Sequence, residues 1–149
     1  MEAMELYTKI FPDSKIGSVL KYGDGVGNET HEVPENVQHA HFEIDGYSFF
    51  CMDNSYDHKF DFNEAISIVV MTDDQEETDH LWNSLIADGG RASMCGWLKD
   101  KFGVSWQIVP KKLIELMNDS DPYKSQKVMQ AMMTMQKIVI SDLEQAYQS

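Results

Sequence analysis

Basic residues are scarce in this chain: 12 Lys and Arg stand against 25 Asp and Glu, which gives a formal net charge of −13. Proteins that bind nucleic acid or anionic membrane surfaces draw their affinity from clustered Lys and Arg. The composition therefore argues against both kinds of partner. Long apolar runs are also missing, since none approaches the roughly 20 residues that a transmembrane helix needs.

Cysteine is nearly absent too, with Cys51 and Cys95 as the two examples. Two cysteines cannot form the disulfide framework of a small secreted domain, and no Cys-x-x-Cys pair or zinc-finger spacing occurs. Residues 1–11 lack the basic segment and apolar stretch of a secretory signal. We therefore expect a cytoplasmic protein, in which both cysteines are small core residues rather than nucleophiles.

The 149 residues include enough apolar side chains, 42% of the total, to fold as one domain with a real core. A helix is predicted first, because apolar residues recur at helical spacing over residues 2–11 until Pro12 ends the pattern. Residues 16–22 alternate in the manner of a strand. One face of that strand would carry four side chains: Ile16, Ser18, Leu20 and Tyr22.

Two further strands are predicted at 37–44 and 47–53. Between them lies Asp45-Gly46, a dipeptide that favours the tight turn of a hairpin because it tolerates positive φ. The hairpin is the clearest local prediction that the sequence allows.

Strand periodicity gathers polar side chains on one face of residues 37–44. His39, His41 and Glu43 alternate with Ala40, Phe42 and Ile44, which we expect beneath the helix. Two histidines and a glutamate can bind Zn²⁺, or act as general base and acid near neutral pH. They can equally line a pocket as hydrogen-bonded contacts without chemistry, and the sequence leaves both interpretations open.

The second half repeats this order with a strand in front. The nearly continuous apolar run 65–72 predicts a strand covered on both faces. Thr72 or Asp73 offers the N-cap of a following helix, which Gly89-Gly90 ends. Three short strands are then predicted, at about 91–94, 97–100 and 104–109.

A helical tail completes the chain. Pro110 suits the first position of a short helix, and Asp121-Pro122 opens another that we expect to reach about Lys137. Four methionines on the latter form an adaptable packing face, for this domain's own sheet or for a second subunit: Met129, Met132, Met133 and Met135. Ser141-x-x-Glu144 is a capping box for a last helix.

This order predicts an α+β fold of paired βαβββ units, the first lacking its opening strand. Residues 97–110 (WLKDKFGVSWQIVP) resemble the closing hairpin of the vicinal oxygen chelate superfamily, the relatives of glyoxalase and extradiol dioxygenases. The upstream pattern Tyr7-x-x-Ile10-Phe11-Pro12-x-Ser14-x-Ile16 is most similar to its PhnB-like branch. We expect one domain over 1–149, with a partial unit at 1–53, a second at 65–109 and the tail at 110–149.

The resemblance bears on metal binding. In the metal-dependent members, four side chains hold a divalent cation, and the last of them, a Glu, is matched here by Gln107. Two other ligand positions fall within 65–67 and 49–51, where no carboxylate or imidazole occurs, and the position on the absent strand has no match. The resemblance therefore implies neither the family metal nor any other cofactor.

Some members of this branch carry a methyltransferase label for ubiquinone precursors. A nucleotide-type methyl donor is normally held by a glycine-rich turn that opens a helix in a doubly wound sheet. The glycines of Gly23-x-Gly25-x-Gly27 are instead followed by a predicted loop that contains Pro34. The sequence gives this label no support.

The leading hypothesis is a protein that binds a small organic molecule in a concave, metal-free pocket. Its expected contacts are His39, His41, Ser67, Trp97, Ser105 and Gln107. One alternative is an enzyme of the glyoxalase or dioxygenase type that uses His39 and His41, with or without a divalent metal. Another is an interaction protein that uses the methionine-rich helix. The resemblance further implies a homodimer, and the unpaired sheet edge left by the absent strand favours association.

Overall fold

The computed structural model describes residues 1–24, 32–56 and 58–149. They form two compact units, Met1–Phe60 and Asp61–Ser149, and each mixes helices with a sheet. The expected α+β class is therefore confirmed, as is the expected order of helices and strands. The single domain over residues 1–149 stays a prediction. Among the described residues, no helix combines the length and apolarity needed to cross a membrane.

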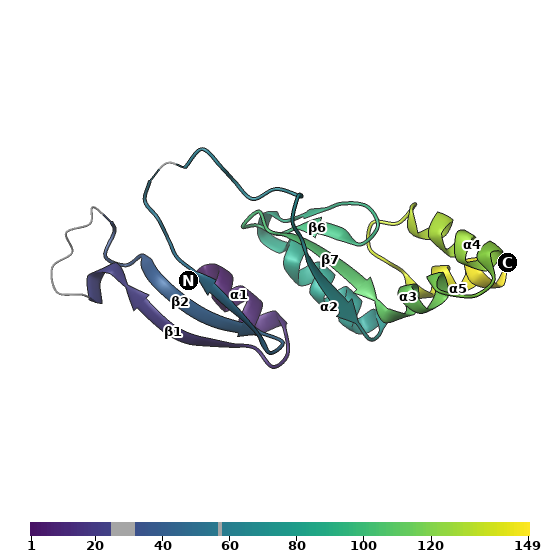
Figure 1. The fold of residues 1–149 in the computed structure, drawn as a ribbon, viewed down its shortest axis with the longest axis horizontal. Coiled ribbons are helices and arrows are strands. Elements are labelled where there is room, and N and C mark those ends of the chain that lie inside the picture. Colours follow the sequence, from purple (N-terminus) through teal and green to yellow (C-terminus); the bar gives the residue numbers. More distant parts are fainter. Residues whose placement is uncertain (25–31, 57) are drawn as a thin grey trace. The chain divides into compact units, whose positions relative to one another are not determined.

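The first unit is a helix packed on an antiparallel sheet (Figure 1). Its elements are α1 (Glu2–Ile10), β1 (Lys15–Lys21), the 3₁₀ turn η1 (Tyr22–Asp24), β2 (Val37–Ile44) and β3 (Tyr47–Cys51). The strands pair in the order β1-β2-β3. Buried side chains from α1 meet buried side chains from β2, and the rings of Tyr7 and Phe42 stack with their centroids 6.4 Å apart. The core of this unit therefore lies between helix and sheet.

The turn between β2 and β3 has the predicted form. Asp45 and Gly46 both adopt positive φ, 48° and 76°, as a two-residue hairpin loop requires. The register that follows pairs His41 with Phe50. This turn therefore decides which β3 side chain lies beside the histidines.

The expected alternation along β1 fails, because its register against β2 shifts twice, between Ile16 and Val19 and again between Leu20 and Lys21. Ile16 pairs with Phe42 but Val19 pairs with Ala40, so an extra residue bulges between them and the later side chains change face. Leu20 then lies opposite His39, on the face away from α1. The bulge contains Gly17, where a Cβ would lie 2.6 Å from His41 Nδ1. Absence of a side chain here leaves room for the His41 ring.

The second unit has a mixed four-stranded sheet with a helix on one face (Figure 1). Its sheet contains β4 (Ile68–Thr72), β5 (Arg91–Ala92), β6 (Trp97–Lys99) and β7 (Ser105–Pro110), in the order β4-β7-β6-β5. The helix α2 (Gln75–Ile86) continues into the 3₁₀ turn η2 (Ala87–Gly89). β4 runs parallel to β7, and the other pairs are antiparallel.

β7 lies inside this sheet and separates its two faces. Trp106 and Ile108 are fully buried on the side that faces α2. The indole N–H of Trp106 donates to the buried carboxylate of Asp100, at 2.9 Å, so this Trp belongs to the core. Ser105 and Gln107 alternate with these residues and point to the opposite face.

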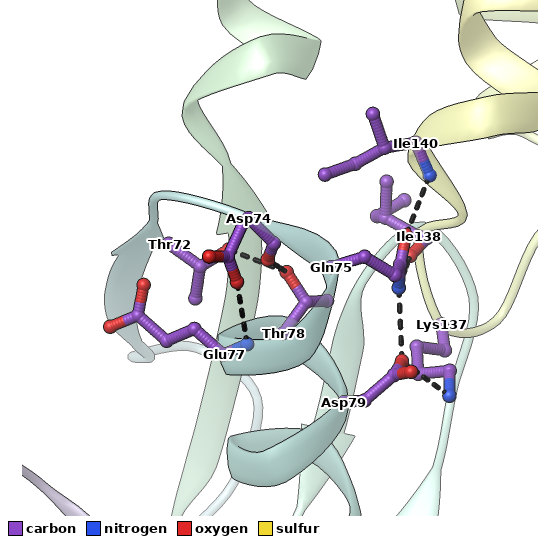
Figure 2. Close-up of polar contacts among 9 residues, drawn as sticks. All are labelled: Thr72, Asp74, Gln75, Glu77, Thr78, Asp79, Lys137, Ile138 and Ile140. Carbon is purple, nitrogen blue, oxygen red and sulfur yellow. Dashed lines mark hydrogen bonds and ion pairs between the residues drawn. The ribbon is translucent and has the colours of Figure 1, made fainter.

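Two sequence expectations for the β4–α2 region need correction. β4 is not covered on both faces, since Val69 is 52% exposed and lies on the face away from α2. The N-cap of α2 is Asp74 rather than Thr72 or Asp73 (Figure 2). Its carboxylate accepts a hydrogen bond from the Glu77 backbone N–H, at 2.9 Å. Thr72 is instead buried, with its hydroxyl 2.7 Å from that of Thr78, and so is not available as a cap.

The helices of the tail lie beyond the end of β7 (Figure 1). Together with β7 they form an apolar cluster. The tail contains α3 (Lys111–Met117), α4 (Pro122–Met132) and α5 (Ile140–Gln148). Asp121 caps α4 as predicted, by accepting from the Tyr123 backbone N–H. Buried side chains from the three helices, from β7 and from Ile138 between α4 and α5 meet in the cluster: Val109, Leu113, Leu116, Val128, Ile138 and Leu143.

α4 ends at Met132, five residues before the expected Lys137. The N–H groups of Met133, Thr134 and Met135 still donate to carbonyls of α4, but the carbonyls of the segment that follows accept from elsewhere in the unit. The backbone N–H groups of Cys95 and Gly96 donate to the carbonyls of Met135 and Gln136, at 2.7 and 2.8 Å. These tertiary bonds replace the helical bonds that the sequence pattern suggested.

Gln75 of α2 bonds both ends of the next segment, Ile138–Ile140 (Figure 2). Its side-chain carbonyl accepts from the Ile140 N–H, at 2.8 Å, and its amide donates to the Ile138 carbonyl, at 3.2 Å. Ile140 is the first residue of α5, whose N-terminal N–H groups have no intrahelical partner. The predicted cap at Ser141 is therefore wrong, and a side chain from another helix satisfies the start of α5.

We expect Gln75→Ala to lower the free energy of unfolding by about 1–2 kcal/mol, because it leaves two backbone groups near α5 without a partner. Equilibrium denaturation in urea measures the change. Gln145→Ala, an exposed position on α5, should shift it by less than about 0.5 kcal/mol and serves as control. Equal stability of the two variants would contradict the role assigned to Gln75.

The ion pair between Lys137 and Asp79, 2.7 Å apart, also holds this segment (Figure 2). Hydrogen bonds from Lys137 and Gln75 lower the pKa of the Asp79 carboxyl. A lowered pKa stabilises the fold above the ordinary value of about 3.9, and the stabilisation is lost as pH falls through the lowered value. Wild type should therefore be more stable than Asp79→Asn at pH 7, with the difference shrinking as the pH falls below about 3.9. A difference in melting temperature that is the same at every pH would contradict this linkage.

Candidate functional site

The register of the second sheet places three hydrogen-bond donors in a row. Arg91 pairs with Lys99, and Lys99 pairs with Ser105. Directly paired residues project from the same face of a sheet, so the three side chains share the face that α2 leaves open. A guanidinium, an ammonium and a hydroxyl therefore lie side by side on three neighbouring strands.

A cavity of about 260 Å³ lies at this row. The side chains that matter for its chemistry are Glu64, Arg91, Ser93, Trp97, Lys99 and Ser105. The volume is slightly smaller than the roughly 300–1,000 Å³ typical of ligand sites, so it suits only a small molecule. Its walls combine one aromatic ring with charged and hydroxyl groups.

Ser105 is the unusual member of this cavity. It is 3% exposed, and its hydroxyl has no hydrogen-bond partner among the described residues. Buried polar groups are nearly always bonded, because an unpaired one costs about 1–3 kcal/mol. A buried, unpaired hydroxyl at a cavity wall is the arrangement expected where a ligand supplies the missing partner.

The charges around the cavity are partly paired. Lys99 Nζ lies 2.5 Å from a carboxylate oxygen of Glu64. This hydrogen bond from Lys99 is the main reason that the pKa of Glu64 lies below its ordinary value, and the charge of Arg91 adds to the effect. Two cations and one acid thus face the same space.

A second polar group adjoins the row. Trp97 pairs with Gln107, one step along the same face from Lys99 and Ser105. The Gln107 amide donates to the Ser67 hydroxyl, at 2.8 Å. The structure therefore brings together four of the six predicted contacts: Ser67, Trp97, Ser105 and Gln107.

His39 and His41 lie on the sheet of the first unit, on the face away from α1. Both rings contact Phe50, with centroids 5.5 and 5.0 Å apart. His41 Nε2 lies 3.2 Å from the Ser48 hydroxyl. Ala40, Phe42 and Ile44, which alternate with the histidines along β2, are buried as predicted.

These residues do not fit the metal ion of the superfamily that the sequence resembles. No three His, Cys, Asp or Glu side chains within the described ranges are placed to hold a metal together. Glu43 instead pairs with Lys15, at 3.2 Å, and the Gln107 amide turns its N–H toward Ser67. A ligand set of neutral amide and hydroxyl groups lacks the charge that a divalent cation prefers.

The remaining candidates add little chemistry. Cys51 and Cys95 are half-buried and free, and burial raises the pKa of the Cys51 thiol, which makes it a weaker nucleophile. Gly25 and Gly27 of the glycine run lie outside the described residues. The two described sheets are antiparallel and mixed, unlike the doubly wound sheet that usually holds a nucleotide.

Sequence reasoning missed Glu64, Arg91 and Lys99. The pairing of Lys99 with Ser105 follows from the hairpin that the sequence did predict, so that residue could have been found. Arg91 needed the register of a third, two-residue strand, and Glu64 lies outside any helix or strand. Neither leaves a periodic signal in the sequence.

Comparison with known proteins agrees with this fold. The family model described as 3-demethylubiquinone-9 3-methyltransferase matches residues 1–109. A putative 3-demethylubiquinone-9 3-methyltransferase, PhnB protein, from Bacillus cereus is 34% identical, with a TM-score of 0.66 over 73% of this chain and 88% of that one. Protein PA1353 from Pseudomonas aeruginosa is 23% identical, with a TM-score of 0.61 over 73% of this chain and 86% of that one.

No curated protein matches the sequence. The family match covers well over half of the chain, and the Bacillus cereus structure shares both sequence and fold with it. The chain therefore belongs to the PhnB-like family, whose model is described as 3-demethylubiquinone-9 3-methyltransferase.

Proposed function

We propose that this PhnB-like protein binds a small organic molecule in the cavity of its second unit, without the metal ion of the wider superfamily. The observation that carries the proposal is the Ser105 hydroxyl, which is buried, unpaired and part of the cavity wall. A ligand that hydrogen-bonds this group would remove the cost of leaving it unsatisfied.

The other walls support the same function. Trp97 is half-buried and offers a flat apolar surface. The Gln107–Ser67 pair lies on the same face and is able to exchange its internal hydrogen bond for one with a ligand. An aromatic surface beside a few placed polar groups is typical of small-molecule sites.

The enzyme alternative depends on His39 and His41. The described contacts of these side chains are aromatic packing with Phe50 and one hydrogen bond to Ser48. Neither contact pairs an imidazole with a carboxylate, which is the usual way to orient a catalytic base. Binding is therefore the favoured function. The double variant His39→Ala/His41→Ala tests the catalytic alternative.

Ser105→Ala should leave the free energy of unfolding unchanged or raise it by about 1–3 kcal/mol, because it removes a buried hydroxyl that lacks a partner. Urea denaturation of the ligand-free protein checks this. Thr72→Val is the matched control: it removes a buried hydroxyl that is paired, and should destabilise by about 1 kcal/mol or more.

A fragment screen by NMR tests binding itself. We expect bound fragments to shift the backbone resonance of Ser105 and the indole resonance of Trp97, with weaker binding to Ser105→Ala than to wild type. Destabilisation by Ser105→Ala, or fragments that all bind away from these resonances, would overturn the proposed site.

We also propose a cytoplasmic homodimer. Both cysteines are free, as suits a reducing compartment. Apolar side chains stay exposed on the open face of β4, at Val69 and Met71, and a second copy of the chain is one means of covering them. Native mass spectrometry should show twice the 17.1 kDa chain mass, without bound metal. A monomer at micromolar concentration would refute the dimer, and a stoichiometric metal would refute the metal-free site.

A further inference from the structure

We infer that the cavity of the second unit recognises the carboxylate of a small organic acid through Arg91, Lys99 and Ser105, and that Glu64 occupies this place until the acid displaces it. This inference rests on the proposed small-molecule function and adds the chemical class of the ligand.

The row across β5, β6 and β7 consists of groups that donate hydrogen bonds. Arg91 presents a fork of N–H groups and Lys99 an ammonium, while the Ser105 hydroxyl has no partner in the described structure. Neighbouring strands lie about 4.8 Å apart, so the Cα atoms of the three residues span roughly 10 Å, and the long side chains of Arg91 and Lys99 are what allow all three groups to line one cavity. A carboxylate accepts several hydrogen bonds at once and matches this set.

Glu64 shows that the row attracts a carboxylate. It contributes no strand or helix hydrogen bond, yet its carboxylate lies 2.5 Å from Lys99 Nζ and its pKa is lowered first by that bond and then by other contacts, including the charge of Arg91. The Glu64 side chain is 64% exposed. Exposed ion pairs of this kind contribute little to stability, so a ligand carboxylate is able to replace it.

The charge count favours an anion as well. The chain carries a net charge of −13, yet the charged groups named in the cavity wall are two cations and one acid. When the ligand displaces the Glu64 carboxylate, Arg91 and Lys99 both face the ligand. The cavity is therefore locally positive although the protein as a whole is negative, and this local charge favours an anionic ligand.

Trp97 indicates what kind of group the ligand carries next to its carboxylate. It lines the cavity beside the row of donors and is half-buried. Its ring offers a flat apolar wall next to the carboxylate position, in a volume of about 260 Å³. The combination suits a compact acid with a flat apolar body, for which benzoate is a simple probe.

The experiment compares benzoate with benzamide, which has the same ring and shape but no charge. Titrations of the full chain are followed by the NMR resonances of Ser105 and of the Trp97 indole. Benzoate should shift both resonances and bind at least about tenfold more tightly than benzamide, as expected when charge-assisted hydrogen bonds are lost.

Variants separate the roles within the row. Glu64→Gln should tighten benzoate binding by about two- to fivefold, because a competing carboxylate is removed. Arg91→Met and Lys99→Met should each weaken it by about tenfold. Lys101→Met is the matched control and should change nothing, since its ammonium lies over the Phe102 ring rather than in the cavity wall.

Different results would overturn the carboxylate preference and the small-molecule site. Equal binding of benzoate and benzamide, with no effect of Glu64→Gln, would overturn the carboxylate inference and keep the small-molecule site. Failure of both probes to shift Ser105 would also overturn the inference. The fragment screen then decides the proposed function, because neutral fragments that shift Ser105 would sustain it.

Discussion

The strict alternation of side chains along β7 is the constraint on which the second unit depends. Trp106 and Ile108 must point toward α2 to build the core, so Ser105 and Gln107 must point to the open face. The buried carboxylate of Asp100 holds this register, since it accepts from the Trp106 indole and from two backbone N–H groups of the turn before β7. A slip of one residue would bury the amide of Gln107 and expose the indole.

The same strand explains how a small core and a polar cavity coexist. β7 has strands on both sides, so its backbone groups are paired within the sheet and its polar side chains are free to line the cavity face. The unsatisfied Ser105 hydroxyl is tolerated because the surrounding strands are held by their own pairing and by α2. The core thus lies on one face of the sheet and the polar cavity on the other.

Local rules were enough to predict much of this structure. Asp45-Gly46 specifies its hairpin through backbone conformation alone, and the period of two in β2 correctly places His39 and His41 opposite the buried side chains. Predictions failed where a distant partner decides. The length of α4 and the start of α5 depend on bonds to Cys95, Gly96 and Gln75, which lie far away in sequence. Arg91 and Lys99 were not predicted as cavity residues for the same reason, because they lie side by side only when three strands pair.

The turn at Cys95-Gly96 connects the part of the chain that the family model matches with the helical tail that it does not match. The family match ends at residue 109, yet the amides of this turn are satisfied by carbonyls of Met135 and Gln136. A Cβ at Gly96 would also meet the Ile108 carbonyl oxygen at 2.7 Å, so the turn is enclosed by β7 on one side and by the tail on the other. Trp97 follows it directly. The tail therefore supports the start of the strand that carries Trp97, and residues beyond the family match belong to the same compact unit as the sheet.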